Sequence, residues 1–138
     1  MNFAYLWVAL GGALGSVSRY WINGLVAQKF FNTASVFPLG TLVINVTGSF
    51  LIGIIGALTA PEGRLAPQSR AFATLFLMIG ICGGYTTFSS FSLQTLNLLR
   101  ERELLYAGGN ILLSVTLCMV AVWLGWLLGT VIGSTKGH

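Results

Sequence analysis

The sequence predicts an all-α membrane protein, with four transmembrane helices in a single domain that covers residues 1–138. Hydrophobic residues fill 55% of the chain, and charged residues fill only 7%. A soluble domain carries about 25% charged residues, so this chain has too little polar surface to cover a water-soluble globule. Its mean hydropathy is +0.84. The apolar residues gather into four stretches, and a spanning helix needs about 20 such residues.

The first stretch covers residues 3–26. It is too long for the apolar segment of a signal peptide, and no positively charged segment precedes it, so we expect it to be the first spanning helix of the mature chain. A short connection over 29–38, closed by a proline, leads to the second helix over 39–60. Residues 61–70 hold two prolines and three charges, which predicts a solvated loop.

The third helix is expected over 71–99, with a break in mid-membrane near 83–86. Adjacent glycines stand at 83 and 84, and each costs about 1 kcal/mol relative to alanine inside a helix. The hydroxyl residues that follow can bond backbone groups released by a break. At membrane depth, a non-helical backbone segment is tolerated only where it is buried inside the protein or lines a water-filled cavity. This stretch is therefore the expected functional centre. A tight polar turn, 100–103, precedes the fourth helix over 104–132.

Small residues recur at four-residue spacing, which lets helix backbones approach closely in lipid. We assign these positions a role in packing alone. The clearest cases are Gly11 with Gly15, Ser49 with Gly53, and the series Gly125, Gly129 and Gly133.

The basic residues outside the helices are balanced between the two faces of the membrane. Three lie on the face of the termini and three on the other, namely Arg64, Arg70 and Lys136 against Lys29, Arg100 and Arg102. The positive-inside rule needs an excess on one side to fix orientation. We therefore predict insertion in both orientations and an antiparallel dimer. The alternative is a single orientation set by other features.

Several functions are disfavoured by composition. The basic residues never cluster, which speaks against nucleic-acid binding, and Cys82 and Cys118 show neither a disulfide framework nor metal-ligand spacing. No Asp or Glu falls inside a predicted span, and the only histidine is His138. Proton relays in membranes use such groups, and hydrolysis needs a general base. The chain is therefore expected to be neither a proton-coupled transporter nor an enzyme.

Arg19 is the only ionisable side chain well inside a predicted span. Such a charge usually faces a bundle interior or a water cavity, where it would attract anions. The alternative is that Arg19 extends to the headgroups from the last third of its helix.

Polar residues mark two further helix faces. Asn45 interrupts the second helix, with Thr41 and Ser49 one turn to either side. A second stripe on the fourth helix consists of Tyr106, Asn110, Ser114 and Cys118. Each stripe can line a polar path or form an interhelical hydrogen-bonding seam; for Asn45 the lining role is favoured.

Phe88 and Phe91 share one helical face. Aromatic rings have a positive edge, so ring edges can stabilise an anion without holding it tightly. Hydroxyl residues surround the pair, namely Thr87, Ser89, Ser90 and Ser92, and favour this function over ordinary core packing.

These motifs together resemble those of the Fluc/CrcB fluoride channel family. Residues 83–92 read GGYTTFSSFS, residues 40–45 read GTLVIN, and residues 11–15 read GGALG, followed by Arg19 and Tyr20. The resemblance covers all four helices in order. It differs at Ser90, where threonine is common in the family, and at Asn110, where a smaller hydroxyl residue is expected.

The resemblance implies an antiparallel, dual-topology homodimer with two fluoride pores. It implies that Phe88 and Phe91 are the pore phenylalanines, that Asn45 lines the pore and that Arg19 lies in a vestibule. It further implies a structural Na⁺ at the dimer centre, held by the backbone carbonyls of Gly83 and Thr86. The remaining pore candidates are Thr87, Ser89, Ser90, Tyr106 and Ser114.

The implied function is a passive, fluoride-selective channel in the bacterial inner membrane that relieves fluoride toxicity. One alternative is a small dual-topology multidrug exporter, which normally needs an intramembrane glutamate that this chain lacks. Another is a membrane scaffold without transport, in which Asn45 and Phe88 would tolerate apolar replacement.

Overall fold

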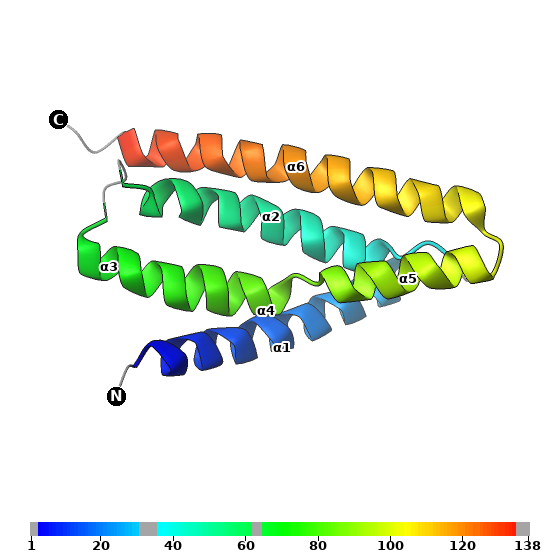
Figure 1. Cartoon of the computed structure of the whole chain (residues 1–138), viewed down its shortest axis with the longest axis horizontal. Helices are drawn as coiled ribbons and strands as arrows, with labels where there is room; N and C mark the ends of the chain where they lie inside the picture. Colours follow the sequence, from blue (N-terminus) through cyan, green and yellow to red (C-terminus); the bar gives the residue numbers. More distant parts are fainter. Residues whose placement is uncertain (1–2, 31–35, 62–64, 135–138) are drawn as a thin grey trace.

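A computed structural model describes residues 3–30, 36–61 and 65–134, and every element in these ranges is a helix (Figure 1). In chain order the elements are α1 (Ala4–Phe30), α2 (Leu39–Thr59), α3 (Pro67–Phe72), the π-helix η1 (Ala73–Cys82), α4 (Gly83–Tyr85), α5 (Phe88–Arg100) and α6 (Leu104–Ser134). Elements α3, η1 and α4 follow one another without interruption. The all-helical class with a bent third helix is confirmed.

Three helical stretches are long and apolar enough to cross a membrane: Leu39–Thr59, Pro67–Arg100 and Leu104–Ser134. The chain is therefore a multi-pass membrane protein. At 27 residues α1 is long enough, but it contains Arg19 and Lys29 and is not among these three. A membrane crossing by α1 stays a prediction.

Two helix ends differ from those expected. α1 continues to Phe30 instead of ending at residue 26, because Gln28 and Lys29 are good helix formers and no proline or glycine stops the helix there. The third helix begins at Pro67 and not at residue 71. Proline suits the first turn of a helix, where its missing N–H is not needed, so the preceding loop is shorter than expected.

Helix packing follows the small residues. α2 packs along α6, and α1 packs against η1 and α4. A Cβ atom added to Gly53 or Gly125 would overlap a backbone carbonyl of the opposite helix, so these glycines allow direct backbone contact. Gly133 faces open space, and the expected series on α6 therefore packs only as far as Gly129.

The break in the third helix lies at Thr86 and Thr87, whose backbones are extended, and not at the glycines. Gly83 and Gly84 are helical. A Cβ atom on Gly84 would lie 2.5 Å from the carbonyl oxygen of Gly12, so this glycine serves the close approach of α1. Gly84 is thus a packing residue beside the break, whereas a Cβ atom on Gly83 would meet only the Met78 carbonyl oxygen, at 3.8 Å.

α5 ends in a tight turn that satisfies its last carbonyls. Arg102 N–H donates to the Leu99 carbonyl at 3.1 Å, and Glu103 N–H donates to the Leu98 carbonyl at 2.8 Å. This pair of bonds is a Schellman motif. Its left-handed position, usually glycine, is Arg102 with φ of 62°.

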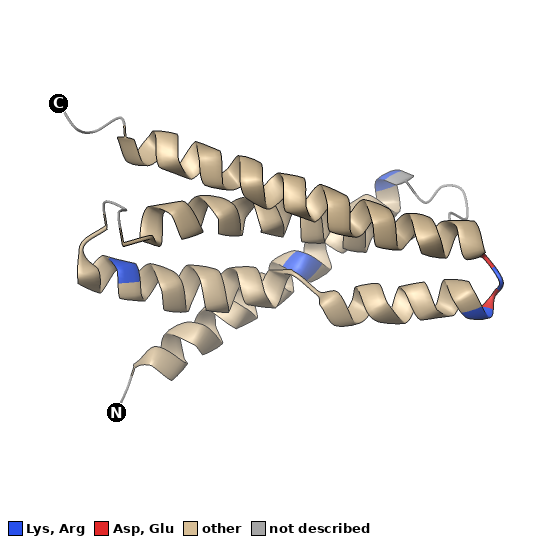
Figure 2. Ribbon diagram, turned by 45° about the horizontal axis from the view of Figure 1, so that its top comes forward, with Lys and Arg blue, Asp and Glu red and all other residues tan. Residues whose placement is uncertain are grey.

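Charged positions lie mainly at the ends of the molecule (Figure 2). A blue turn near the middle of the bundle is the exception, and Arg19 is the basic residue in the interior of α1. Arg64 and Lys136, which enter the charge balance, lie outside the described residues.

Candidate functional site

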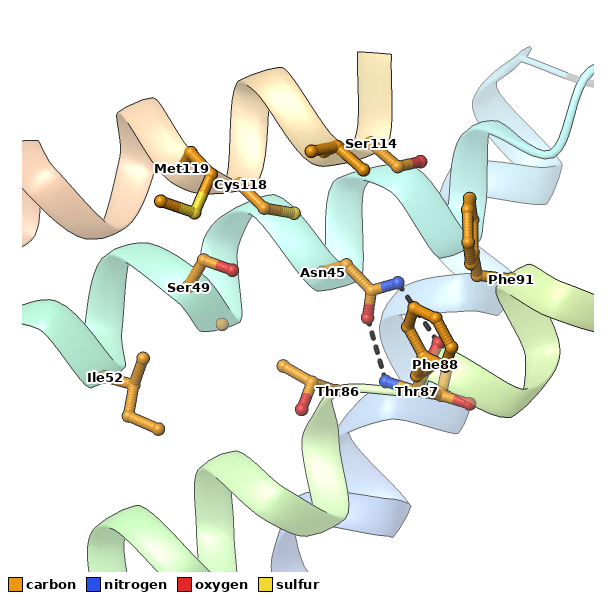
Figure 3. A pocket seen from close by; sticks show the side chains of 12 residues that line it. Asn45, Ser49, Ile52, Thr86, Thr87, Phe88, Phe91, Ser114, Cys118 and Met119 are labelled. Carbon is orange, nitrogen blue, oxygen red and sulfur yellow. Dashed lines mark hydrogen bonds between the residues drawn. The ribbon is translucent and has the colours of Figure 1, made fainter. Parts of the chain in front are cut away.

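A cavity of about 440 Å³ lies beside the break in the third helix (Figure 3). α2, the break itself, α5 and α6 all contribute to its wall. The lining residues are Asn45, Gly48, Ser49, Ile52, Thr86, Thr87, Phe88, Phe91, Ser114, Val115, Cys118 and Met119. None of these is acidic, so among the described residues the wall of this cavity carries no negative charge.

Asn45 bonds the broken backbone with both ends of its amide (Figure 3). Its Nδ2 donates to the Thr87 carbonyl at 3.1 Å, and its Oδ1 accepts from the Thr87 N–H at 2.8 Å. The bond to the Thr87 N–H replaces the helical bond that this extended residue cannot make, while the bond to the carbonyl of Thr87, the N-cap of α5, adds to the bond that this carbonyl accepts within the helix. A primary amide has two N–H donors, so a second donor is available on the cavity side.

Thr86 and Thr87 cap the two helices that meet at the break. Thr86 donates to the Cys82 carbonyl twice, from its backbone N–H and from Oγ1, each at 2.9 Å, which ties Thr86 to the end of the preceding helix. Thr87 Oγ1 accepts from the Ser90 N–H at 3.2 Å and is the N-cap of α5. The same oxygen donates to Ser90 Oγ at 2.9 Å. The N-terminus of α5, with its partial positive charge, therefore opens at this cavity.

The two phenylalanines lie together at that N-terminus. The ring centroids of Phe88 and Phe91 are 5.3 Å apart, with 45° between the ring planes. Both line the cavity, and Phe88 is 78% exposed. The wall thus combines aromatic rings with the polar groups of Asn45 and Thr87.

Arg19 lies at a second, more polar cavity of about 390 Å³. This cavity also receives Asn23, Ser90 and Gln94, and Thr87 lines both cavities. The threonine at the break therefore separates a phenylalanine side from an arginine side. Arg19 therefore lines a cavity whose wall is built from α1, α2, the break and α5.

Some pore candidates lie outside the first cavity. Ser89 lines neither of the two cavities, and Ser90 lines only the second. Tyr106 is 46% exposed and packs against Phe37, with ring centroids 6.4 Å apart. Gly83, which has no side chain to line a wall, is exposed on the surface of the chain.

The chain matches the family model described as CrcB-like protein, Camphor Resistance (CrcB), over residues 6–126. That is most of its length. The chain belongs to the CrcB family.

Curated relatives of this CrcB-family chain agree in name. A protein of Methylocella silvestris is 55% identical over 96% of this chain and 98% of its own length. One of Opitutus terrae is 56% identical over 96% and 97%, and one of Rhodospirillum rubrum is 53% identical over 88% and 90%. All three are named fluoride-specific ion channel FluC. They carry the name of a channel, in agreement with the expectation that the chain is not an enzyme.

Three polar residues near the break of this CrcB-family chain were not singled out from its sequence. Asn23 and Gln94 line the Arg19 cavity, and the Tyr85 hydroxyl lies 2.9 Å from Thr47 Oγ1. Helical spacing is a signal for the first two, since Asn23 follows Arg19 by one turn and Gln94 follows Ser90 by one turn. Tyr85 has no local signal, because its partner is on another helix.

Proposed function

We propose that this chain is a passive, fluoride-selective channel of the bacterial inner membrane that relieves fluoride toxicity. One observation carries the proposal. In a chain of the CrcB family, the cavity beside the broken helix brings together Phe88, Phe91 and Asn45. Its relatives over nearly the whole length are named fluoride-specific ion channels.

The described groups around this cavity suit a small anion. The N-terminus of α5 and the second N–H of Asn45 offer positive partial charge. Aromatic ring edges add positive potential of a weaker kind. A narrow path lined by such donors can replace the hydration shell of fluoride, as the lining groups of other selectivity filters do for their ions. The same donors would stabilise a cation far less.

A passive pathway is sufficient for this task. Neutral HF crosses lipid and dissociates in a more neutral cytoplasm, which traps the anion inside. A selective leak then lowers internal fluoride without coupling to an energy source. This agrees with the absence of Asp and Glu from the stretches Leu39–Thr59, Pro67–Arg100 and Leu104–Ser134, because proton coupling generally relies on intramembrane relays.

The same proposal includes an antiparallel, dual-topology homodimer with two pores, in which α1 also crosses the membrane. Two features of the single chain support a second copy. Phe88 is 78% exposed although its ring lines the cavity. In α6 only 17% of the apolar window is buried within the chain, which leaves a long face for lipid or a partner.

A structural Na⁺ at the dimer centre, held by the carbonyls of Gly83 and Thr86 from each chain, completes the proposal. The residues at the break fit such an ion. Thr87 N–H donates to Asn45 Oδ1, so it does not give Gly83 the bond that a continuous helix would supply. The extended backbone of Thr86 takes its carbonyl out of the helical ladder as well. Rings of backbone carbonyls are established ligands for alkali cations.

The test is fluoride efflux from liposomes that contain the purified protein, recorded with an ion-selective electrode and with chloride as the control ion. We expect fast loss of fluoride and negligible loss of chloride. Phe91→Ile should slow the efflux, since it removes a ring from the cavity wall. Phe72→Ile is the matched control, because Phe72 packs on Trp7 and Phe76 away from the cavity and should leave efflux unchanged.

The outcomes separate the alternatives. Absence of fluoride movement from folded, inserted protein would refute the channel. Fluoride efflux that survives Phe91→Ile, Phe88→Ile and Asn45→Leu without change would show that this cavity is not the pathway. If the protein is instead a membrane scaffold without transport, the wild type should move neither fluoride nor chloride.

A further inference from the structure

Asn110 on α6 is the most deeply buried polar side chain among the described residues, at 1% exposed. It is also the position where the family resemblance leads one to expect a smaller hydroxyl residue. Burying an amide is unfavourable unless the amide is hydrogen-bonded. The bonds that Asn110 makes therefore indicate what the larger side chain does in this particular chain.

These bonds join α6 to α5. Asn110 Nδ2 donates to Thr95 Oγ1 at 2.8 Å, and Thr95 Oγ1 donates to the Phe91 carbonyl at 2.8 Å. Ser114 Oγ donates to Asn110 Oδ1 at 3.4 Å. Thr95 has one hydroxyl proton, which it gives to Phe91, so it can only accept from Asn110. The direction of the relay from α6 to the Phe91 backbone is thereby determined.

We propose that Asn110 is a positioning residue that holds Phe91 in place at the cavity wall. α5 follows an extended break, and its start is fixed to α2 by the bonds between Asn45 and Thr87. The bond from Asn110 to Thr95 fixes the same helix to α6 one turn after Phe91. With both attachments, α5 has little freedom to rotate or slide, and the ring of Phe91 stays where it narrows the cavity.

Side-chain length explains why an amide is needed. A serine at position 110 lacks the two additional heavy atoms with which asparagine reaches Thr95. It would leave a void in a buried seam and the Thr95 oxygen without its donor. The seam also contains Leu98 and Ala107, which are 4% and 1% exposed, so no bulk water is present to replace the lost bond.

The proposal rests on the proposed function for its transport readout, and the experiment uses three isosteric variants of the full chain. Asn110→Leu removes the donor and keeps the volume, and Thr95→Val removes the acceptor. We expect each to lower the ratio of fluoride to chloride efflux by about threefold to thirtyfold, the range that corresponds to one intramembrane hydrogen bond. The double variant should be no worse than either single variant, because both changes cut the same link.

Two controls separate positioning from general stability. Thr95→Ser keeps the hydroxyl that Thr95→Val removes and should keep the selectivity of the wild type. Thr130→Val changes a hydroxyl on α6 that donates to the Leu127 carbonyl of the same helix, and it should have no effect. In addition, the double variant should regain part of the unfolding temperature lost by the single variants, because replacing both partners removes the unpaired donor and the unpaired acceptor of their bond, although the Ser114 hydroxyl still lacks the Asn110 acceptor. Its selectivity should stay low.

A second readout does not depend on transport. With 4-fluorophenylalanine in place of Phe91, the ¹⁹F NMR spectrum of the protein in detergent should show one sharp resonance, which Asn110→Leu broadens or splits. An unchanged spectrum together with unchanged selectivity would overturn the proposal for Asn110 and leave the channel intact. If the wild-type protein does not move fluoride, the proposed function fails, and the NMR comparison alone decides whether Asn110 positions Phe91.

Discussion

At the scale of single residues, Asn45 combines two tasks that are usually divided between side chains. Its amide bonds the N–H and the carbonyl of Thr87, and its remaining N–H is available to the cavity. A polar residue in mid-helix was recognisable from the sequence as a candidate. Its partner was not, because Thr87 lies 42 positions away and only the packing of α2 on α5 brings the two together.

Asn45→Leu should therefore reduce both stability and transport. The change removes two hydrogen bonds, each worth about 0.6 to 2 kcal/mol within a membrane, so the unfolding temperature in detergent should fall. Fluoride efflux should fall in the same variant because the break is no longer held.

Asn45→Asp distinguishes the two tasks. The carboxylate keeps an acceptor for the Thr87 N–H but loses the donor and adds a negative charge, which repels fluoride. We expect a smaller loss of stability than for leucine and an equal or greater loss of efflux. An Asn45→Asp protein with efflux equal to the wild type would contradict the placement of Asn45 at an anion pathway.

At the scale of elements, Gly11 and Gly15 of α1 and Gly80 and Gly84 of the third helix permit close approach of the two backbones and do not break the helices. The sequence pattern places small residues correctly along these helices. It also predicts a break near 83–86, and the observed break begins at the last residue of that range, Thr86, and includes Thr87, while the glycine pair itself stays helical. A glycine pair in a sequence has two interpretations, because glycine is found both where a helix breaks and where two helices pack closely in a membrane. Only the neighbour, here Gly12 against Gly84, decides between them.

Adjacent glycines of α1 provide a matched test of this interpretation. A Cβ atom on Gly11 would overlap the Phe76 carbonyl and lie 2.9 Å from the Gly80 Cα, whereas one on Gly12 meets nothing within 4 Å. Gly11→Ala should destabilise the fold by about 1 to 3 kcal/mol, as overpacking does. Gly12→Ala should stabilise it by about 1 kcal/mol through helix propensity.

The measurement is thermal unfolding of both variants in the same detergent. Equal shifts for the two positions would argue against direct contact between α1 and η1. If Gly12→Ala lowered the unfolding temperature more than Gly11→Ala, the face of α1 that contacts η1 would be the one that carries Gly12, contrary to the structure.

At the scale of the whole molecule, the balanced charges are the observation on which dual topology depends. The fold class, the multi-pass character and the family follow from composition and motifs. The arrangement of two chains does not, because a single chain does not determine which faces meet a partner and which meet lipid. The proposed dimer is thus best tested through orientation in the membrane.

Two pairs of substitutions should bias that orientation in opposite directions. Gln68→Lys with Ser69→Lys adds two charges to the face of the loop between α2 and α3. Glu101→Lys with Glu103→Lys adds two to the opposite face. Each pair creates an excess of positive charge on one face, which should fix the chain in one orientation by the positive-inside rule. Because the proposed antiparallel dimer needs both orientations, either variant alone should give little fluoride efflux from cells.

Co-expression of the two variants should restore efflux, because each then supplies one orientation of an antiparallel pair. Compartment-specific tags on each variant provide the control that orientation has changed. Full activity of either variant alone, with its orientation shown to be uniform, would rule out the antiparallel dimer.

The Schellman turn at the end of α5 has a consequence for how freely this chain can be altered. Arg102 occupies its left-handed position with φ of 62°, a conformation that costs a residue with a Cβ roughly 1 to 2 kcal/mol. Glycine there would relax the backbone. It would also remove one of the three positive charges on that face and disturb the charge balance on which the proposed dual topology rests. Relief of backbone strain and retention of the positive charge thus make opposite demands on the residue at this one position.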